Sequence, residues 1–253
     1  MTDAPLIGIV TPPGWYDPTA AEFERLCVAP VRTQQCIVAV PDLDYDDLNA
    51  IAAALPEVER AAQMMGLTGA AAVAMTGTPF VWAGLAAEPD IRLRLAGVTA
   101  AAACPTVMAG TAIMDALRAL GAERIAVATP YYTKSWRNQT EVALRAAGFD
   151  VLAVQSADDL ELIEAIASID DHARLSSADQ LREIMRRLIG ANPGADALVV
   201  AGAGARLLEM TPAMEAELGL PVVASDTALY WALAGALGLE LRPGALGKMG
   251  ALL

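Results

Sequence analysis

The chain has 253 residues, of which 55% are hydrophobic and 19% are charged. This composition excludes a disordered chain and suffices for a large buried core, in either one α/β domain or two smaller lobes. Acidic residues outnumber basic ones by 30 to 17, and the formal charge of −13 argues against nucleic acid and anionic lipid as partners.

Short apolar runs alternate with longer amphipathic ones along the chain. The runs that predict strands are Leu6–Val10, Ile37–Val40, Ala71–Met75, Ile125–Ala128, Val151–Val154, Ala197–Ala201 and Val222–Ala224. Between them, helical periodicity covers Ala50–Met65, Ala109–Leu120, Thr140–Ala147, Ser177–Ile189 and Pro212–Leu218. This alternation predicts mainly parallel sheets with helices on both faces.

The stretch from Gly66 to Ala87 has no charge over 22 residues, which is long enough to cross a membrane. It contains four glycines and Pro79, and much of the rest is alanine, which is only weakly lipophilic. We interpret it as a buried strand, a turn and a following loop, because a parallel strand covered on both faces gives a continuous apolar run. The N-terminus has no basic segment, so we expect no signal peptide and no membrane contact.

Two sequence segments recur. Ile7–Pro12 is echoed by Ile125–Pro130, 118 residues later, and the end of Ala71–Gly77 is loosely echoed by the end of Ala197–Gly202, 125 residues later. Strand ends that recur in the same order predict two pseudo-symmetric lobes, each a small parallel sheet flanked by helices, with a cleft between them. We assign residues 1–112 and 225–253 to the N-terminal lobe and residues 113–224 to the C-terminal lobe, although the last predicted strand could return to the first lobe.

Four predicted strands end in turns that contain glycine, proline or hydroxyl groups. These turns are Thr11–Gly14, Thr76–Pro79, Thr129–Tyr132 and Gly202–Ala205. Glycine lets the backbone approach a ligand closely, and successive backbone N–H groups can hold an anion. One such turn is ordinary loop chemistry, but four at the carboxyl ends of strands predict a shared site for an anion.

These segments resemble the aspartate/glutamate racemase superfamily, in the branch of arylmalonate decarboxylase and maleate isomerase. The matching segments are Ile7–Pro13, Gly69–Thr78, Ala116–Gly121 with Arg124–Thr129 and Tyr131, Asp196–Gly204, and Leu218–Ser225 with Trp231. The resemblance spans nearly the whole chain and is weakest over residues 14–60 and 155–190. It implies the two-lobed fold of that superfamily and a cofactor-independent lyase or isomerase that acts on a small carboxylate or dicarboxylate.

The resemblance also implies a cysteine in each lobe, on opposite faces of the substrate, although arylmalonate decarboxylase keeps only the second. This sequence departs from both patterns. Gly77 stands where the first thiol is expected, and Gly202 where the second is expected, or Ala201 if the register slips by one. Glycine can neither give nor take a proton, so a two-cysteine racemase or a thiol-adding isomerase is disfavoured.

What the resemblance leaves is the part of the site that holds an anion. It implies that Thr78 and Tyr131 are oxyanion donors, with backbone amides near Gly77 and Gly202–Ala203 completing the hole around an enediolate. The remaining substrate-binding residues would be Pro12, Pro13, Pro79, Tyr132 and Gly204. Two alternatives stay open: a non-catalytic carboxylate-binding protein, and a lyase or hydrolase that uses a bound water.

Other ionisable residues have two interpretations each. Asp226 could face the cleft or cap a helix, Lys134 could pair with a substrate or lie on the surface, and Arg206 could clamp a second carboxylate or be solvated. His172 lies in an acidic loop and is expected on the surface. The aspartates at 42, 44, 46 and 47 lack the glycine and glutamate of a calcium loop.

We expect neither a metal nor an organic cofactor. Cys27, Cys36 and Cys104 have no paired spacing and, with the one histidine, do not match a zinc site. The Gly202–Leu207 segment lacks the third glycine of a dinucleotide fingerprint. Unpaired cysteines favour a reducing compartment, so we expect a cytoplasmic protein, possibly a homo-oligomer.

Overall fold

The structure is a computed structural model that describes residues 4–14, 16–169 and 177–253. The strands of its first sheet are β1 (Leu6–Thr11), β2 (Arg32–Ile37), β3 (Ala72–Met75) and β4 (Thr106–Met108). Those of its second sheet are β5 (Arg124–Ala128), β6 (Asp150–Gln155), β7 (Ala197–Val200) and β8 (Val222–Ala224). The strand orders are β2-β1-β3-β4 and β6-β5-β7-β8, and all neighbours are parallel. This confirms the predicted fold class of two small parallel sheets flanked by helices.

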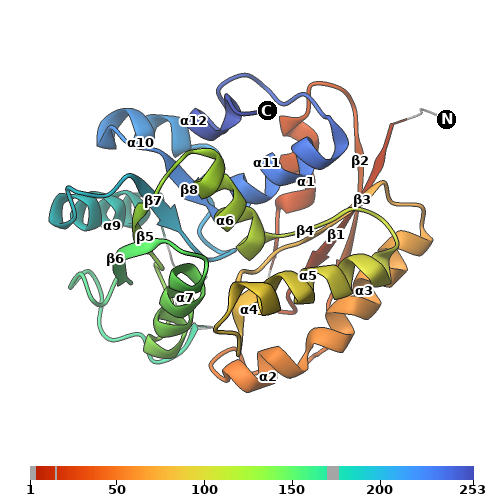
Figure 1. The fold of residues 1–253 in the computed structure, drawn as a ribbon, viewed down its shortest axis with the longest axis horizontal. Helices are drawn as coiled ribbons and strands as arrows, with labels where there is room; N and C mark the ends of the chain where they lie inside the picture. The colour runs from red at the N-terminus through yellow and green to blue at the C-terminus, as the bar shows by residue number, and fades with distance from the viewer. Residues whose placement is uncertain (1–3, 15, 170–176) are drawn as a thin grey trace.

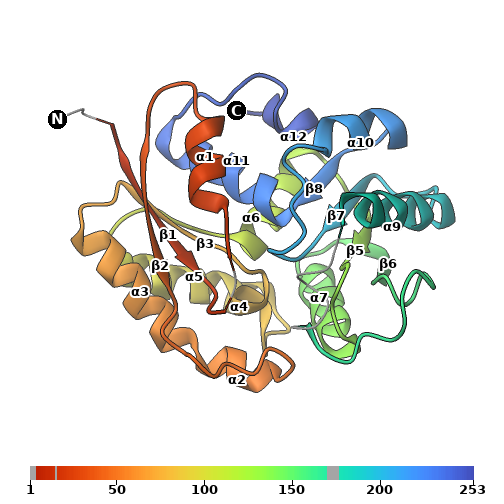
Figure 2. The same ribbon diagram turned by 180° about the vertical axis from the view of Figure 1, so that it is seen from behind.

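Helices cover both sheets (Figure 1). Those that accompany the first sheet are α1 (Thr19–Leu26), α2 (Leu48–Ala53), α3 (Leu55–Leu67), α4 (Pro79–Trp82) and α5 (Glu88–Ala102). The others are α6 (Ala109–Ala119), α7 (Lys134–Ala146), α9 (Ala178–Ala191), α10 (Thr211–Leu218), α11 (Ser225–Leu237) and α12 (Gly247–Gly250). Helices α2 to α5 lie on one side of the first sheet and α1 and α11 on the other, as Figure 2 shows from behind. Helices α6 and α11 pack against each other between the sheets.

The recurring segments occupy equivalent places in the two sheets. The first pair forms β1 and β5, and the second pair forms β3 and β7, which lie beside them. Their residues are almost all buried, which explains the continuous apolar runs of these central strands. Strand β8 pairs with β7 and so belongs to the second sheet, whereas α11 contacts β3 and β4. The proposed lobe boundaries remain a prediction.

Some predicted elements differ from the structure. The second strand covers Arg32–Ile37 rather than Ile37–Val40, because it is an edge strand whose side chains are mostly exposed and polar. The three-residue strand β4 had no predicted counterpart. The helix predicted over Ala50–Met65 is two helices, since Pro56 has no N–H to continue the first and begins the second. The helix predicted from Thr140 begins at Lys134.

The uncharged stretch from Gly66 to Ala87 contains β3 and the short helix α4, where a loop was predicted. Phe80, Val81 and Trp82 of α4 are buried, so their apolar character serves the protein core. Within the described part of the chain, no helix has the length and apolar character needed to cross a membrane.

Candidate functional site

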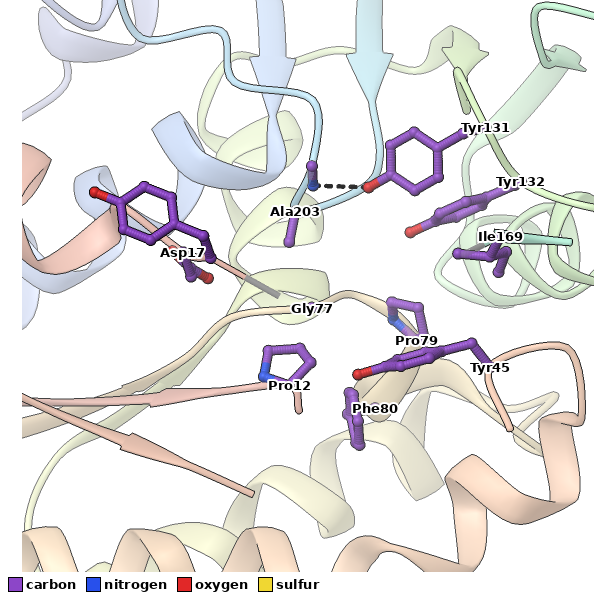
Figure 3. Close-up of a pocket in the computed structure, with 12 residues that line it drawn as sticks. Pro12, Asp17, Tyr45, Gly77, Pro79, Phe80, Tyr131, Tyr132, Ile169 and Ala203 are labelled. Carbon is purple, nitrogen blue, oxygen red and sulfur yellow. Dashed lines mark hydrogen bonds between the residues drawn. The ribbon is translucent and has the colours of Figure 1, made fainter. Parts of the chain in front are cut away.

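The turns that follow β1, β3, β5 and β7 meet at one pocket (Figure 3). Its volume is about 50 Å³, space for roughly four water molecules at about 10–15 Å³ each. The residues that line it are Pro12, Tyr16, Asp17, Tyr45, Gly77, Pro79, Phe80, Tyr131, Tyr132, Ile169, Ala203 and Gly204. The pocket therefore lies where parallel strands end, between the two sheets, and it suits a small ligand.

Seven of the ten predicted site residues line this pocket: Pro12, Gly77, Pro79, Tyr131, Tyr132, Ala203 and Gly204. The other three, Pro13, Thr78 and Gly202, do not line it but contact residues that do. The Pro13 carbonyl accepts a hydrogen bond from the Tyr45 hydroxyl at 2.7 Å. The four turns identified from the sequence are thus brought together, while the roles given to their residues remain predictions.

Tyr131 fills the place next to Gly202. A Cβ atom added to Gly202 would lie 2.8 Å from Tyr131 Cζ, and the backbone φ of +129° already favours glycine. The Tyr131 hydroxyl accepts a hydrogen bond from the Gly204 N–H at 2.7 Å. Burial, with the neighbouring Tyr132, raises the pKa of Tyr131 well above its usual value. The residue is therefore a neutral hydroxyl at physiological pH, held against the turn after β7.

Tyr132 and Thr78 form a second hydroxyl pair, one from each half of the chain. Their oxygens are 2.6 Å apart and either can donate. Both side chains are buried, and Tyr132 lines the pocket whereas Thr78 does not. Burial raises the pKa of Tyr132, while the bond to Thr78 opposes the rise. In this arrangement the Thr78 hydroxyl reaches Tyr132, so its direct contact with a ligand remains a prediction.

Three backbone N–H groups at the pocket have no hydrogen-bond acceptor among the described residues: those of Gly77, Thr78 and Ala203. Gly77 and Thr78 are buried. The Gly202 N–H, in contrast, donates to Ser225 Oγ at 2.9 Å. Buried N–H groups without acceptors are rare in folded proteins, and such a group has a strong tendency to bind water or an anion. Two strand ends thus supply amides that are available to a ligand.

Gly77 permits the close approach of its turn to the rest of the pocket. Its φ is +84°, and an added Cβ would lie 2.8 Å from Pro12 Cγ and 3.3 Å from Phe80 Cδ2. Any side chain here would be strained and would push the turn away from Pro12. Glycine at this position therefore keeps the β1 and β3 turns in contact.

Asp17 is a pocket residue that the sequence interpretation missed. It is 7% exposed, and it is the one residue with a formal charge among the described residues that line the pocket. Its Oδ1 accepts a hydrogen bond from the Thr19 N–H at 2.9 Å, and its Oδ2 accepts one from the Thr76 hydroxyl at 2.7 Å. The pocket wall thus carries a fixed carboxylate beside the end of β3.

Arg206 does not line the pocket. Its guanidinium pairs with Glu22 and with the Tyr230 hydroxyl, and it lies 3.9 Å from carboxylate oxygens of Asp17 and Asp226. Burial disfavours its charge, but Asp226, Tyr230 and Glu22 outweigh that effect and raise its pKa. Arg206 is therefore neither solvated nor available as a clamp for a substrate: it balances an internal cluster of three carboxylates.

The remaining ionisable candidates lie away from the pocket or in other roles. Asp226 is buried, and its Oδ2 accepts hydrogen bonds from the amides of Leu207 and Leu208 in the turn after β7, so it is more than a helix cap. Lys134 is exposed at the start of α7. Asp47 caps α2 through the Asn49 N–H. His172 lies outside the described residues.

The pocket lining contains no cysteine among the described residues. Cys27 is buried, and burial raises the pKa of its thiol to about 11, which suits a core residue rather than a nucleophile. The described residues also contain no cluster of histidine, cysteine, aspartate and glutamate that would hold a metal ion.

A model of the arylmalonate decarboxylase family matches residues 39–250 of this chain. Arylmalonate decarboxylase from Bordetella bronchiseptica is 32% identical over 181 residues, which are 70% of this chain and 70% of that protein. The chain belongs to the arylmalonate decarboxylase family. Maleate isomerase from Geobacillus stearothermophilus is 30% identical over 154 residues, 58% of this chain and 55% of that protein.

Solved structures share the fold. Unliganded arylmalonate decarboxylase has a TM-score of 0.78 and 23% identity, and the match covers 98% of this chain and 99% of that one. A maleate isomerase from Pseudomonas putida with maleate has a TM-score of 0.81 and 21% identity over 98% of each chain. The predicted superfamily branch is confirmed, and the chain is an enzyme of the decarboxylase and isomerase type.

The pocket residues that sequence reasoning missed are Tyr16, Asp17, Tyr45, Phe80 and Ile169. Four of them belong to the two segments in which the family resemblance is weakest. Asp17 had one usable signal: it follows the proline turn after β1 and directly precedes a helix. Tyr45 lies within the acidic run, whose charges favoured a solvated loop over a pocket wall.

Replacing Tyr131 with phenylalanine is expected to lower turnover of the true substrate at least tenfold. The change removes the hydroxyl at the pocket and leaves the Gly204 N–H without its acceptor, which costs about 1–3 kcal/mol of stability. Steady-state kinetics and urea unfolding measure the two effects. Unchanged turnover would remove Tyr131 from the mechanism.

Proposed function

We propose that this chain is a cofactor-independent decarboxylase for a small substituted malonate or a related carboxylate, acting through an enediolate. The amides of Gly77, Thr78 and Ala203 hold the substrate carboxylate and then the enediolate that forms from it. Tyr131 and Tyr132 supply neutral hydroxyl groups at the same pocket. Preorganised donors of this kind are a large part of catalysis, with one donor worth about 2.7–4 kcal/mol.

The available amides are the observation that carries this proposal. They come from the turns after β3 and β7, which lie in different sheets, and neither turn has an acceptor for them among the described residues. The pocket wall around them is largely aromatic and apolar, from Tyr45, Phe80 and Ile169. An apolar wall excludes water and strengthens hydrogen bonds to a developing negative charge.

Decarboxylation is favoured over thiol addition. The residues at the two expected thiol positions are glycines, and at Gly202 the space for a side chain is occupied by the Tyr131 ring. Loss of carbon dioxide requires stabilisation of the enediolate and one proton for the α-carbon, but no nucleophile. The site therefore suits the reaction in the name of the Bordetella relative better than that in the name of the maleate isomerases.

A carboxylate-binding protein without activity is the second candidate. The glycines at both thiol positions favour it, because they leave the anion grip without the acid and base expected from the family. The two candidates share the binding site and differ only in turnover.

The test is incubation in heavy water with phenylmalonate, methylmalonate and maleate, followed by proton NMR. The proposal predicts carbon dioxide loss from at least one malonate, with deuterium at the α-carbon of the product. Formation of fumarate from maleate without decarboxylation would contradict it. Binding of all three acids without any turnover would support the binding protein instead.

A further inference from the structure

The geometry points to Asp17 as the catalytic residue that carries the proton to the α-carbon. This inference rests on the proposed function and supplies the group that the two glycines cannot. Among the described residues that line the pocket, the carboxyl of Asp17 is the one acid stronger than a tyrosine. Burial raises the pKa values of Tyr131 and Tyr132, so these hydroxyls are the weaker proton donors.

Asp17 lies next to the amides proposed to hold the substrate. Its Oδ2 accepts the hydrogen bond of Thr76, the residue that directly precedes Gly77. Its other oxygen lies 3.9 Å from Arg206, which follows the Gly202–Ala205 turn. The carboxyl is thus placed between the ends of β3 and β7, the two strands whose turns carry the available N–H groups (Figure 3).

The surroundings of Asp17 fix it without occupying it fully. A carboxylate offers about four acceptor positions, and Thr19 and Thr76 each take one. Arg206 is turned to Glu22 and Tyr230 and donates no hydrogen bond to Asp17 within the described structure. Both oxygens therefore keep capacity for a proton, while the orientation of the side chain is set by its two neighbours.

The proposed step is balanced by one proton from water. In a bound malonate the bond from the α-carbon to one carboxylate breaks, its electron pair forms the enediolate, and carbon dioxide leaves. Protonated Asp17 then gives its proton to the α-carbon, which forms the new C–H bond and leaves Asp17 as a carboxylate. A solvent proton restores it for the next turnover. General acid–base groups of this kind contribute about 10²–10⁴-fold.

The deciding variant is Asp17→Asn, which keeps the shape and the oxygen that accepts the Thr19 N–H. Its matched control is Asp47→Asn, because Asp47 accepts the amide of Asn49 with the same two-residue spacing but lies outside the pocket lining. We expect turnover of phenylmalonate to fall at least a hundredfold in Asp17→Asn and less than threefold in Asp47→Asn. Binding of phenylacetate, measured by NMR titration, should stay within about threefold in both.

Asp17→Asn turnover within threefold of the wild type would overturn the assignment of Asp17 alone. A wild-type chain that turns over none of the malonates would overturn the proposed function and, with it, this inference. If Asp17→Asn does not fold, Thr76→Val decides the question, since it keeps the carboxyl and removes the hydroxyl that orients it. Turnover of Thr76→Val should then fall at least tenfold with phenylacetate binding retained, and unchanged turnover would overturn the assignment.

Discussion

Replacing Arg206 with methionine is expected to lower the free energy of unfolding by about 3–5 kcal/mol at pH 7. The guanidinium is the one cation in contact with Asp17, Glu22 and Asp226 within the described structure, and its side chain is 21% exposed. Methionine fills a similar volume but leaves three buried carboxylates without a counter-charge. Urea unfolding of the two proteins measures the difference.

The loss in Arg206→Met should be smaller at pH 5 than at pH 7. Burial raises the pKa of Asp226 in the folded protein, and the charge of Arg206 opposes that rise. Without Arg206 the pKa of Asp226 rises further, so its proton is bound more tightly in the folded than in the unfolded chain. The folded state then loses stability as the pH increases above the unfolded value near 4, and regains it in acid.

Arg124→Met is the matched control for this prediction. Arg124 pairs with Asp196 at 2.9 Å, but its side chain is 53% exposed, so solvent screens the pair. The control should change the unfolding midpoint little at either pH. Equal losses in Arg206→Met and Arg124→Met would show that the buried cluster does not depend on Arg206.

Replacing Gly202 with alanine is expected to lower turnover about a hundredfold, the effect of a displacement of about 1 Å at a reacting centre. The added methyl would lie 2.8 Å from Tyr131 Cζ and must push the ring away. Tyr131 would then lose the Gly204 N–H, and the turn that carries Ala203 would move with it. Kinetics with the active malonate gives the result.

Gly148→Ala separates this effect from backbone strain. Gly148 also has a positive φ, +91°, but nothing lies within 4 Å of an added Cβ. It should therefore lose stability through strain, at about 1–2 kcal/mol, and keep its turnover. If Gly202→Ala retained full turnover, the close contact between Tyr131 and the β7 turn would have no part in the reaction.

The central strands and their turns could be predicted because their signals are local. Strands β1, β3, β5 and β7 are buried on both faces and read as apolar runs that end in glycine, proline or threonine. Their recurrence predicted two similar halves, and the parallel arrangement placed the four turns at one site. The edge strand β2 had no such signal, because exposed polar residues dominate it.

The parts of the site that depend on tertiary contacts could not be predicted. Asp17 is fixed by Thr76, which is 59 residues away, and Thr78 meets Tyr132 across 54 residues. The sequence therefore identified Thr78 as polar and close to the site, but not that its hydroxyl pairs with Tyr132. The partners of Arg206 also come from distant segments, α1 and α11, so its role as an internal counter-charge was not visible.

An NMR titration of the nitrogen-15-labelled protein with phenylacetate tests the anion grip most directly. The account predicts that the amide protons of Gly77, Thr78 and Ala203 shift downfield and saturate together, since each gains a carboxylate oxygen as acceptor. The amide of Gly202, which already donates to Ser225, should move less. Saturable binding that leaves the first three amides unchanged would contradict a carboxylate held by these backbone groups.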